Sequence, residues 1–196
     1  MLLAGVETAA VLIERCHLAD VVCFRPETRH EDDRGWFVRT LDVDVAERAG
    51  VDARAFLQDS QSRSRRGVLR GMHGRAGAGE AKLVRCARGA VFDVLVDARP
   101  TSSTFGRSAV FRLDDEEGRH LYVPRGFLHG FQALTEWADV CYRIDRGHDP
   151  AEDLAVRYDD PDLAIRWPLP VSGVSGRDAA AGGWRELADR LGAGRR

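Results

Sequence analysis

The sequence predicts an all-β sandwich or barrel, and two features of its pattern support this prediction. Apolar and polar residues alternate over short runs. Within residues 90–97, Phe92, Val94 and Val96 fall on one face and the residues between them on the other, as in a strand with one buried face. Turn signals rich in Gly, Pro and Asp separate these runs at intervals of about 8–12 residues, which is typical of sandwiches and barrels.

We expect a strand at each alternating run and helices only at the periphery. In chain order, the expected strands span residues 21–24, 36–41, 68–73, 82–87, 90–97, 108–113, 120–123, 131–134 and 139–144. A short helix over residues 44–49 ends at Gly50. A C-terminal helix over residues 184–191 places Trp184, Leu187 and Leu191 on one side. The stretch 171–183 is expected to form a loop laid across the domain, and 192–196 a frayed end.

The chain has no internal repeat or low-complexity linker, so we expect one domain over residues 1–196. Its core spans roughly residues 21–170, and residues 171–196 form the C-terminal loop and helix.

The composition excludes several classes of protein. Lys+Arg is 29 and Asp+Glu is 31, giving a net charge of −2, so no general basic field points to nucleic acid. No run approaches the roughly 18 apolar residues of a membrane span, and no basic segment of a signal peptide opens the chain. The cysteines are scattered without a CxxC pair, so we expect reduced core residues in a cytoplasmic protein rather than disulfides or a zinc site. They are Cys16, Cys23, Cys86 and Cys141.

The chain contains no Asn, and its only lysine, Lys82, stands against 28 arginines, because Lys+Arg totals 29. Arginine is a planar, permanently charged fork, whereas lysine is a compact point donor. A single surviving lysine is either a chance remnant of the composition or a residue retained for its chemistry.

Two histidine motifs refine the fold. His73 closes the run Gly67-Val-Leu-Arg-Gly-Met-His73, and His129 follows Pro124-Arg-Gly-Phe-Leu. A Gly-x5-His segment and a later Pro-x-Gly-x2-His segment, both on strands, are the pattern of a cupin jelly roll. We therefore expect an all-β cupin jelly-roll barrel with short peripheral helices, including the C-terminal one.

The metal-binding version of this pattern carries a second His where this chain has Arg75, and a cation does not ligate a metal. Glu80 is the next carboxylate after His73. A facial triad of His73, His129 and Glu80 remains an alternative, but the residues favour a site without metal or cofactor.

A pocket without metal still has chemistry available to it. An isolated His73 would be an ordinary interior histidine, but Arg70 and Lys82 accompany it on neighbouring runs. A neutral imidazole can take a proton beside a carbonyl. An ammonium can stabilise the enolate oxygen that forms, and arginines bind phosphates.

Several motifs together resemble the dTDP-4-dehydrorhamnose 3,5-epimerase family of nucleotide-sugar epimerases, over roughly residues 21–178. The motifs in chain order are Asp33-Arg34-Gly35-Trp36-Phe37, Gln58-Asp59-Ser60-Gln61-Ser62, Gly67-Val-Leu-Arg-Gly-Met-His73, Lys82-Leu-Val-Arg-Cys-Ala, Val123-Pro-Arg-Gly-Phe-Leu-His-Gly-Phe131, Cys141-Tyr-Arg143 and Ser175-Gly-Arg-Asp178.

The resemblance implies a metal-free homodimer that epimerises a dTDP-4-keto-6-deoxy sugar beside its C4 ketone. In that pattern His73 is the general base and Asp178 its carboxylate partner. Tyr142 delivers a proton to the opposite face of the sugar, and Lys82 stabilises the enolate. From spacing alone Tyr142 would be a core residue and Asp178 a turn residue. The implied substrate-binding positions are Arg34 (from the partner subunit), Gln58, Ser60, Arg70, Asp93, His129 and Arg143.

Departures from the family pattern leave the sugar and the choice of C3, C5 or both open. Gly74-Arg75 replaces the usual Phe-Gln, which predicts open space and an added cation beside His73. His148 stands where Tyr is common. A metal-dependent cupin enzyme and a catalytically silent sugar-nucleotide-binding homologue remain alternatives. The bias toward Arg is typical of GC-rich genomes. By analogy, we expect such a variant to belong to a deoxysugar pathway of a glycosylated natural product.

Overall fold

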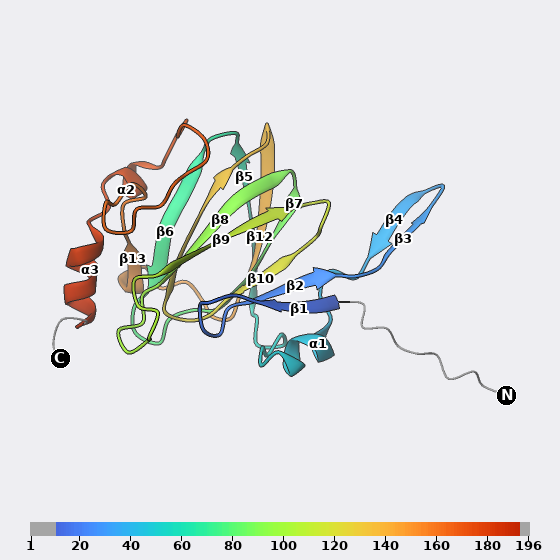
Figure 1. Cartoon of the computed structure of the whole chain (residues 1–196), viewed down its shortest axis with the longest axis horizontal. Coiled ribbons are helices and arrows are strands. Elements are labelled where there is room, and N and C mark those ends of the chain that lie inside the picture. The colour runs from blue at the N-terminus through green and yellow to red at the C-terminus, as the bar shows by residue number, and fades with distance from the viewer. Residues whose placement is uncertain (1–10, 193–196) are drawn as a thin grey trace.

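The computed structural model describes residues 11–192 and consists of two antiparallel sheets packed face to face as a jelly roll, with short helices outside them (Figure 1). The larger sheet has the order β1 (Val11–Arg15), β2 (Val22–Pro26), β10 (His120–Val123), β7 (Lys82–Arg88), β12 (Trp137–Ile144), β5 (Gln58–Arg65). The smaller has the order β13 (Asp153–Ala155), β6 (Leu69–Arg75), β11 (Phe127–Ala133), β8 (Ala90–Asp97), β9 (Ser108–Asp114). The all-β prediction is confirmed.

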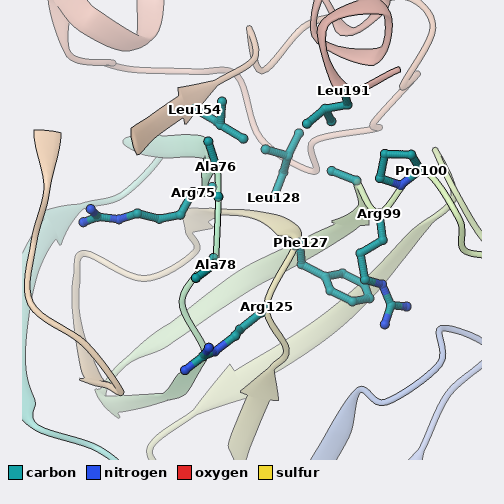
Figure 2. A pocket seen from close by; sticks show the side chains of 15 residues that line it. Arg75, Ala76, Ala78, Arg99, Pro100, Arg125, Phe127, Leu128, Leu154 and Leu191 are labelled. Atoms are coloured by element: carbon teal, nitrogen blue, oxygen red, sulfur yellow. The ribbon is translucent and has the colours of Figure 1, made fainter. Parts of the chain in front are cut away.

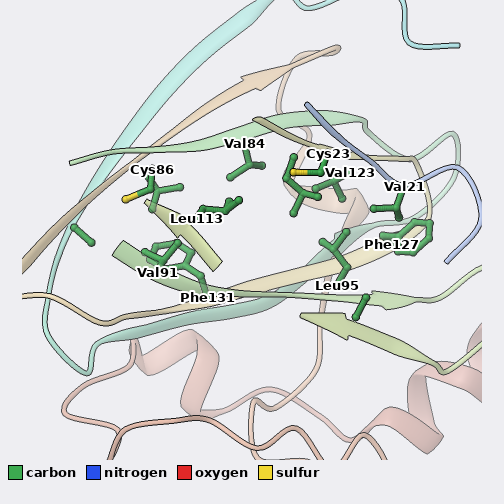
Figure 3. Close-up of a cluster of buried hydrophobic side chains, with 14 of the residues drawn as sticks. Val21, Cys23, Val84, Cys86, Val91, Leu95, Leu113, Val123, Phe127 and Phe131 are labelled. Carbon is green, nitrogen blue, oxygen red and sulfur yellow. The ribbon is translucent and has the colours of Figure 1, made fainter. Parts of the chain in front are cut away.

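The main hydrophobic core fills the space between the two sheets (Figure 3). Val84 and Cys86 project into it from β7, and Val91 and Leu95 project from β8. The members of each pair are an even number of residues apart, so strand alternation aims both at the same face. The cores of most strands predicted from alternation are thus confirmed, although several ends shift by a few residues.

The outer face of the smaller sheet is covered by the C-terminal part of the chain. Trp184 and Leu187 of α3 (Trp184–Leu191) belong to a second apolar cluster with Val94 and Val96 of β8. The prediction that residues 90–97 have only one buried face is therefore wrong, because α3 and the segment before it remove the second face from water.

A third apolar cluster lies on the outer face of the larger sheet, beneath α1 (Val43–Arg48). The carboxylate of Asp42 accepts hydrogen bonds from the first-turn amides of α1, and Gly50 follows with φ +84°. Both are ordinary helix-end signals, and this helix and the C-terminal helix are confirmed.

Several elements lie outside the sequence predictions. They are β1, β3 (Arg29–Asp32), β5, β13, the single-turn helices η1 (Pro150–Glu152) and α2 (Gly176–Ala179). Strand β5 reads Gln-Asp-Ser-Gln-Ser-Arg-Ser-Arg, so it has no apolar alternation to reveal it. Helix α2 interrupts the predicted loop 171–183. A frayed end was predicted over residues 192–196. Its first residue, Gly192, caps α3 with φ +81°, and residues 193–196 lie outside the described residues.

The hairpin of β3 and β4 (Gly35–Val38) projects away from the two sheets (Figure 1). Trp36 and Phe37 on this arm are 54% and 67% exposed, which is unusual for side chains of this size. Among the described helices none is long and apolar enough to cross a membrane. All four cysteines are unpaired; Cys23 and Cys86 are buried as predicted, whereas the other two are only half-buried.

Candidate active site

A cavity of about 670 Å³ opens between the two sheets, beside the segment that leads into α2. Strands β5, β6, β7, β11 and β12 supply most of its wall. The lining residues are Ser60, Ser62, Val68, Leu69, Arg70, His73, Lys82, His129, Phe131, Tyr142, Ile144, Gly173, Val174, Ser175, Arg177 and Asp178. It is a concave hollow with several convergent polar groups, as expected of a small-molecule site.

His73 and Asp178 form the best-defined pair in the cavity. The Nε2 atom of His73 lies 2.7 Å from Oδ1 of Asp178, and the backbone N–H of Gly71 donates to Oδ2 at 3.2 Å. Ser175 caps α2 by accepting from the Asp178 N–H at 3.0 Å, which fixes the carboxylate against β6. The His73 side chain is 37% exposed and that of Asp178 only 4%.

The environment of Asp178 keeps it ionised. Burial raises the pKa of this carboxyl group, but the hydrogen bonds from His73 and Gly71 and the attraction of the imidazole outweigh that effect and lower the pKa below its ordinary value. In the neutral imidazole, Nε2–H donates to Asp178 and the other ring nitrogen carries the lone pair. The pair is therefore built to orient a base and to stabilise the imidazolium that forms.

A second His–carboxylate pair lies deeper in the sandwich. His129 of β11 stands directly opposite His73 of β6, and its Nε2 atom lies 2.8 Å from Oδ2 of Asp93. His129 and Asp93 are almost fully buried, and Oδ1 of Asp93 has no hydrogen-bond partner among the described residues. The His129 ring also meets the Tyr142 ring edge-on, with centroids 6.3 Å apart.

Tyr142 projects into the cavity from β12, and its hydroxyl lies 3.2 Å from Oγ of Ser62 on β5. Burial is the main cause that raises the pKa of this phenol, while the hydrogen bond with Ser62 and the charge of Arg70 oppose the rise. The hydroxyl therefore keeps its proton at neutral pH and can donate it.

Lys82 enters the cavity from the first position of β7, with its side chain 14% exposed. Its Nζ atom lies 2.9 Å from Oε1 of Glu80, and Oε2 of Glu80 lies 2.8 Å from Nε of Arg75. Both oxygens of Glu80 thus face cations. Over residues 11–192 no three His, Cys, Asp or Glu side chains gather as a metal site, so the triad of His73, His129 and Glu80 is not assembled.

The open space predicted beside His73 is not found there, because Gly74 lines a separate hollow and not the His73 cavity. A Cβ atom on Gly74 would lie 2.9 Å from Cδ2 of Leu128 and 3.0 Å from the carbonyl oxygen of Phe127. The guanidinium of Arg75 bonds to the carbonyl of Asp149 and pairs with Glu80 instead of entering the cavity. Arg75 borders a separate hollow of about 270 Å³, shown in Figure 2.

The other predicted site residues divide into two groups. Ser60 and Arg70 line the cavity, and Nε of Arg70 donates to Oγ of Ser64 at 3.0 Å. Gln58 is exposed at the start of β5 and does not line it. Arg34 lies 90% exposed at the tip of the β3–β4 hairpin, paired with Asp32.

Arg143 does not line this cavity either. It follows Tyr142 on β12, so alternation aims it at the opposite face of the sheet. There its Nε lies 3.5 Å from Asp59, and its guanidinium lies over the Phe56 ring.

Ser62, Phe131 and Arg177 are among the lining residues that were not singled out as site residues from the sequence. Two of them had a usable signal. Ser62 lies two residues after Ser60, so both share one face of β5, and Arg177 directly precedes Asp178. Nothing in the local sequence marked Phe131 as a site residue, because the polar side chains that share the cavity with it come mostly from other strands.

Comparison with known proteins assigns the chain to a family. Residues 15–186 match the family model described as dTDP-4-dehydrorhamnose 3,5-epimerase. The chain belongs to this family. The predicted recognition and the predicted enzyme class, an epimerase, are confirmed at the level of the family, and so is the cupin jelly-roll fold.

Two relatives and one solved structure illustrate the match. The dTDP-4-dehydrorhamnose 3,5-epimerase of Methanothermobacter thermautotrophicus is 41% identical over 152 residues, covering 78% of this chain and 81% of the relative. The dTDP-4-dehydrorhamnose 3-epimerase of Streptomyces niveus is 44% identical over 158 residues, covering 80% and 75%. The structure of NovW, a 4-keto-6-deoxy sugar epimerase from the novobiocin gene cluster of Streptomyces spheroides, superposes with a TM-score of 0.87 at 39% identity, covering 93% of this chain and 92% of NovW.

We predict that Asp178→Asn makes the fold of this epimerase-family chain less stable at neutral pH, by about 1–3 kcal/mol, because a charged hydrogen-bond acceptor is lost. A lowered folded pKa contributes stability that is fully present above the unfolded carboxyl pKa of about 3.9 and disappears as pH falls through the folded pKa. In urea unfolding between pH 7 and pH 3, the difference in unfolding free energy between wild type and Asp178→Asn should therefore narrow below about pH 4.

Asp159→Asn is the matched control, because Asp159 pairs with Arg157 at an exposed position. Solvent screening makes such a pair contribute little. A gap between wild type and Asp178→Asn that stays constant down to pH 3 would contradict the assigned ionisation.

Proposed function

We propose that this protein epimerises a dTDP-4-keto-6-deoxy-hexose at C3, C5 or both, by proton abstraction next to the C4 ketone and reprotonation from the other face. The observation that carries the proposal is the content of one cavity. An oriented imidazole, a protonated phenol and an ammonium line it together, at His73, Tyr142 and Lys82. The family named above and the sugar epimerase NovW support this substrate class.

The proposed reaction needs no net change in charge. The free nitrogen of His73 takes the proton from the carbon next to the ketone, and Asp178 stabilises the resulting imidazolium. The electron pair of the broken C–H bond moves to the ketone oxygen, which Lys82 stabilises as an enolate. Tyr142 then gives its proton to the opposite face of the same carbon, which inverts it. The imidazolium loses its proton to solvent, and the phenolate regains one.

Arginines and serines of the same cavity suit the anionic part of the substrate. We assign Arg70 and Ser60 to the diphosphate and nucleotide, because guanidinium groups bind phosphate oxygens in pairs. His129 lines the part of the wall that we assign to the sugar, and Asp93 holds its imidazole from behind that wall without lining the cavity itself. We also assign Gln58 to the nucleotide; because it lies at the exposed start of β5, this contact would be made outside the cavity.

The choice of carbon is open in the proposal. C3 and C5 both flank the C4 ketone, so both carry protons made acidic by the same carbonyl. One relative is named a 3,5-epimerase and another a 3-epimerase. The orientation of the sugar between His73 and Tyr142 decides which carbons are inverted. We place the reaction in deoxysugar biosynthesis in the cytoplasm, in keeping with the four unpaired cysteines.

We further propose that the protein works as a homodimer. The β3–β4 hairpin carries the exposed Trp36 and Phe37 and, at its tip, Arg34. The outer face of the larger sheet has a hollow of about 380 Å³ that Arg85 lines, and the guanidinium of Arg85 has no ion-pair or hydrogen-bond partner within residues 11–192. A second copy that packs against these surfaces would bury the aromatic rings and bring Arg34 to the partner's cavity.

The dimer is tested by sedimentation of wild type and of the double variant Trp36→Ser/Phe37→Ser. We expect wild type at twice the chain mass and the variant shifted toward the monomer, because the substitutions remove the exposed apolar area. Leu57→Ser is a control, since Leu57 is also exposed but lies off the hairpin. A wild-type monomer at micromolar concentration would rule out the dimer.

The reaction is tested by incubating the protein with dTDP-4-keto-6-deoxy-D-glucose in D₂O and following C3 and C5 by NMR. We expect deuterium at one or both carbons, and a loss on the order of 10²–10⁴-fold in His73→Ala, since a general base is removed. His17→Ala, which changes an exposed histidine, should exchange like wild type. Binding without any exchange would instead favour the silent homologue, and activity that depends on an added metal would favour the metal-dependent cupin.

Tyr142→Phe separates the two proton transfers. The ring remains in place but cannot donate a proton, so we expect exchange at the substrate carbon to persist while inversion falls at least about tenfold more. NMR integration of deuterated starting sugar against epimerised product measures both in one sample. Equal losses of exchange and inversion would remove Tyr142 from the role of acid.

A further inference from the structure

We propose that Glu80 is a positioning residue that holds the Lys82 ammonium in place from outside the cavity, and that Arg75 in turn fixes Glu80. The inference rests on the proposed function, because it explains how the group that stabilises the enolate is kept at one location. Glu80 does not line the cavity and so acts only through Lys82.

The contacts form a buried chain of alternating charge. Lys82 Nζ lies 2.9 Å from Oε1 of Glu80, and Arg75 Nε lies 2.8 Å from Oε2. The side chains of Glu80 and Arg75 are 8% and 6% exposed. The Oε2 contact is close without being a well-aligned hydrogen bond, so its strength is mainly that of opposite charges in a poorly hydrated place.

Arg75 is itself fixed, which is why it can serve as an anchor. Its Nη1 atom donates to the carbonyl of Asp149 at 2.7 Å. In Figure 2 its side chain extends away from the apolar residues Leu128 and Leu154 of the neighbouring hollow. The guanidinium is thus held by the Asp149 carbonyl and by Glu80, and it does not line the cavity.

The chain of charges continues to the other side of the cavity. Arg75 Nη1 lies 3.8 Å from Oδ1 of Asp153, and Oδ2 of Asp153 lies 2.8 Å from Nη2 of Arg177. Arg177 lines the cavity beside Asp178. Two cavity cations, Lys82 and Arg177, are therefore the ends of one chain of five alternating charges.

A lysine needs such an anchor more than the other cavity groups do. Its ammonium sits on a flexible four-carbon stem, so it has many accessible positions unless a partner selects one. An enolate is stabilised only by a donor that is already in place when the charge forms. Glu80 is the only carboxylate in an ion pair with Lys82 in the described part of the chain.

The alternative is that Glu80 merely stabilises the turn between β6 and β7. Such a role predicts that Glu80→Gln lowers kcat by the same factor whether or not Lys82 is present. A positioning role predicts that Glu80 has nothing left to do once Lys82 is removed, and a double-mutant cycle separates the two.

The kinetic test compares Glu80→Gln with wild type in the D₂O exchange assay. We expect kcat to fall on the order of 10- to 100-fold, because a small displacement of a catalytic group costs that much, while KM and the dissociation constant for dTDP change less than about twofold. In a Lys82→Met background the same substitution should cost less than about twofold. Glu152→Gln is the matched control, since Glu152 pairs with Arg146 at 2.9 Å outside the cavity.

A spectroscopic test works even without turnover. Because Lys82 is the only lysine, labelling with ¹³Cε-lysine gives a single side-chain resonance. We expect restricted motion of this carbon in wild type and Glu152→Gln, and free motion with a shift toward unbound lysine in Glu80→Gln. If wild type catalyses no exchange, the proposed function fails, whereas this resonance still decides whether Glu80 holds the ammonium.

Glu80→Gln removes the closest carboxylate partner of the buried Arg75, and this loss could prevent the variant from folding. The double variant Arg75→Gln/Glu80→Gln removes both charges, so we expect it to fold and to show the same kcat loss and the same mobile Lys82 signal. Wild-type kcat in either folded variant, an unchanged Lys82 resonance, or an equal loss in the Lys82→Met background would overturn the proposal.

Discussion

The hydrogen bond between His73 and Asp178 is the contact on which the cavity depends, because it joins β6 to the C-terminal part of the chain. Backbone contacts support it: the N–H of Leu69 donates to the carbonyl of Gly173, and Ser175 caps the helical turn that carries Asp178. Packing of Trp184 against the outer face of the smaller sheet holds the segment in place. The same contact therefore completes one cavity wall and orients the proposed base.

Several polar groups inside the sandwich are held by a partner from another part of the chain. Asp93 on β8 pairs with His129, Ser62 on β5 meets the Tyr142 hydroxyl, and Glu80 faces Lys82. Buried polar groups are costly unless they are paired. Pairing them across elements also fixes their directions before a substrate arrives, which is what stabilisation of developing charge requires.

The errors of sequence interpretation occurred where polarity replaced apolar alternation. Strand β5 faces a polar cavity with its serines, so no periodic apolar signal marked it. Residues 90–97 looked half-buried, because the covering layer comes from α3, almost a hundred residues later in the chain. Arg143 was assigned to substrate by its motif; its position next to Tyr142 on a strand places it on the opposite face, outside this cavity.

The sequence by itself determined the fold class, the family and the types of residue in the cavity. Alternation along strands and the order of motifs can both be identified directly from the amino-acid sequence. Only the tertiary structure decided the partners: that Asp178 meets His73 across 105 positions of the chain, and that Arg75 turns to Glu80 rather than into the cavity. Such contacts depend on strand register, on the folding back of the C-terminal segment and on the pairing of buried charges, which no local pattern encodes.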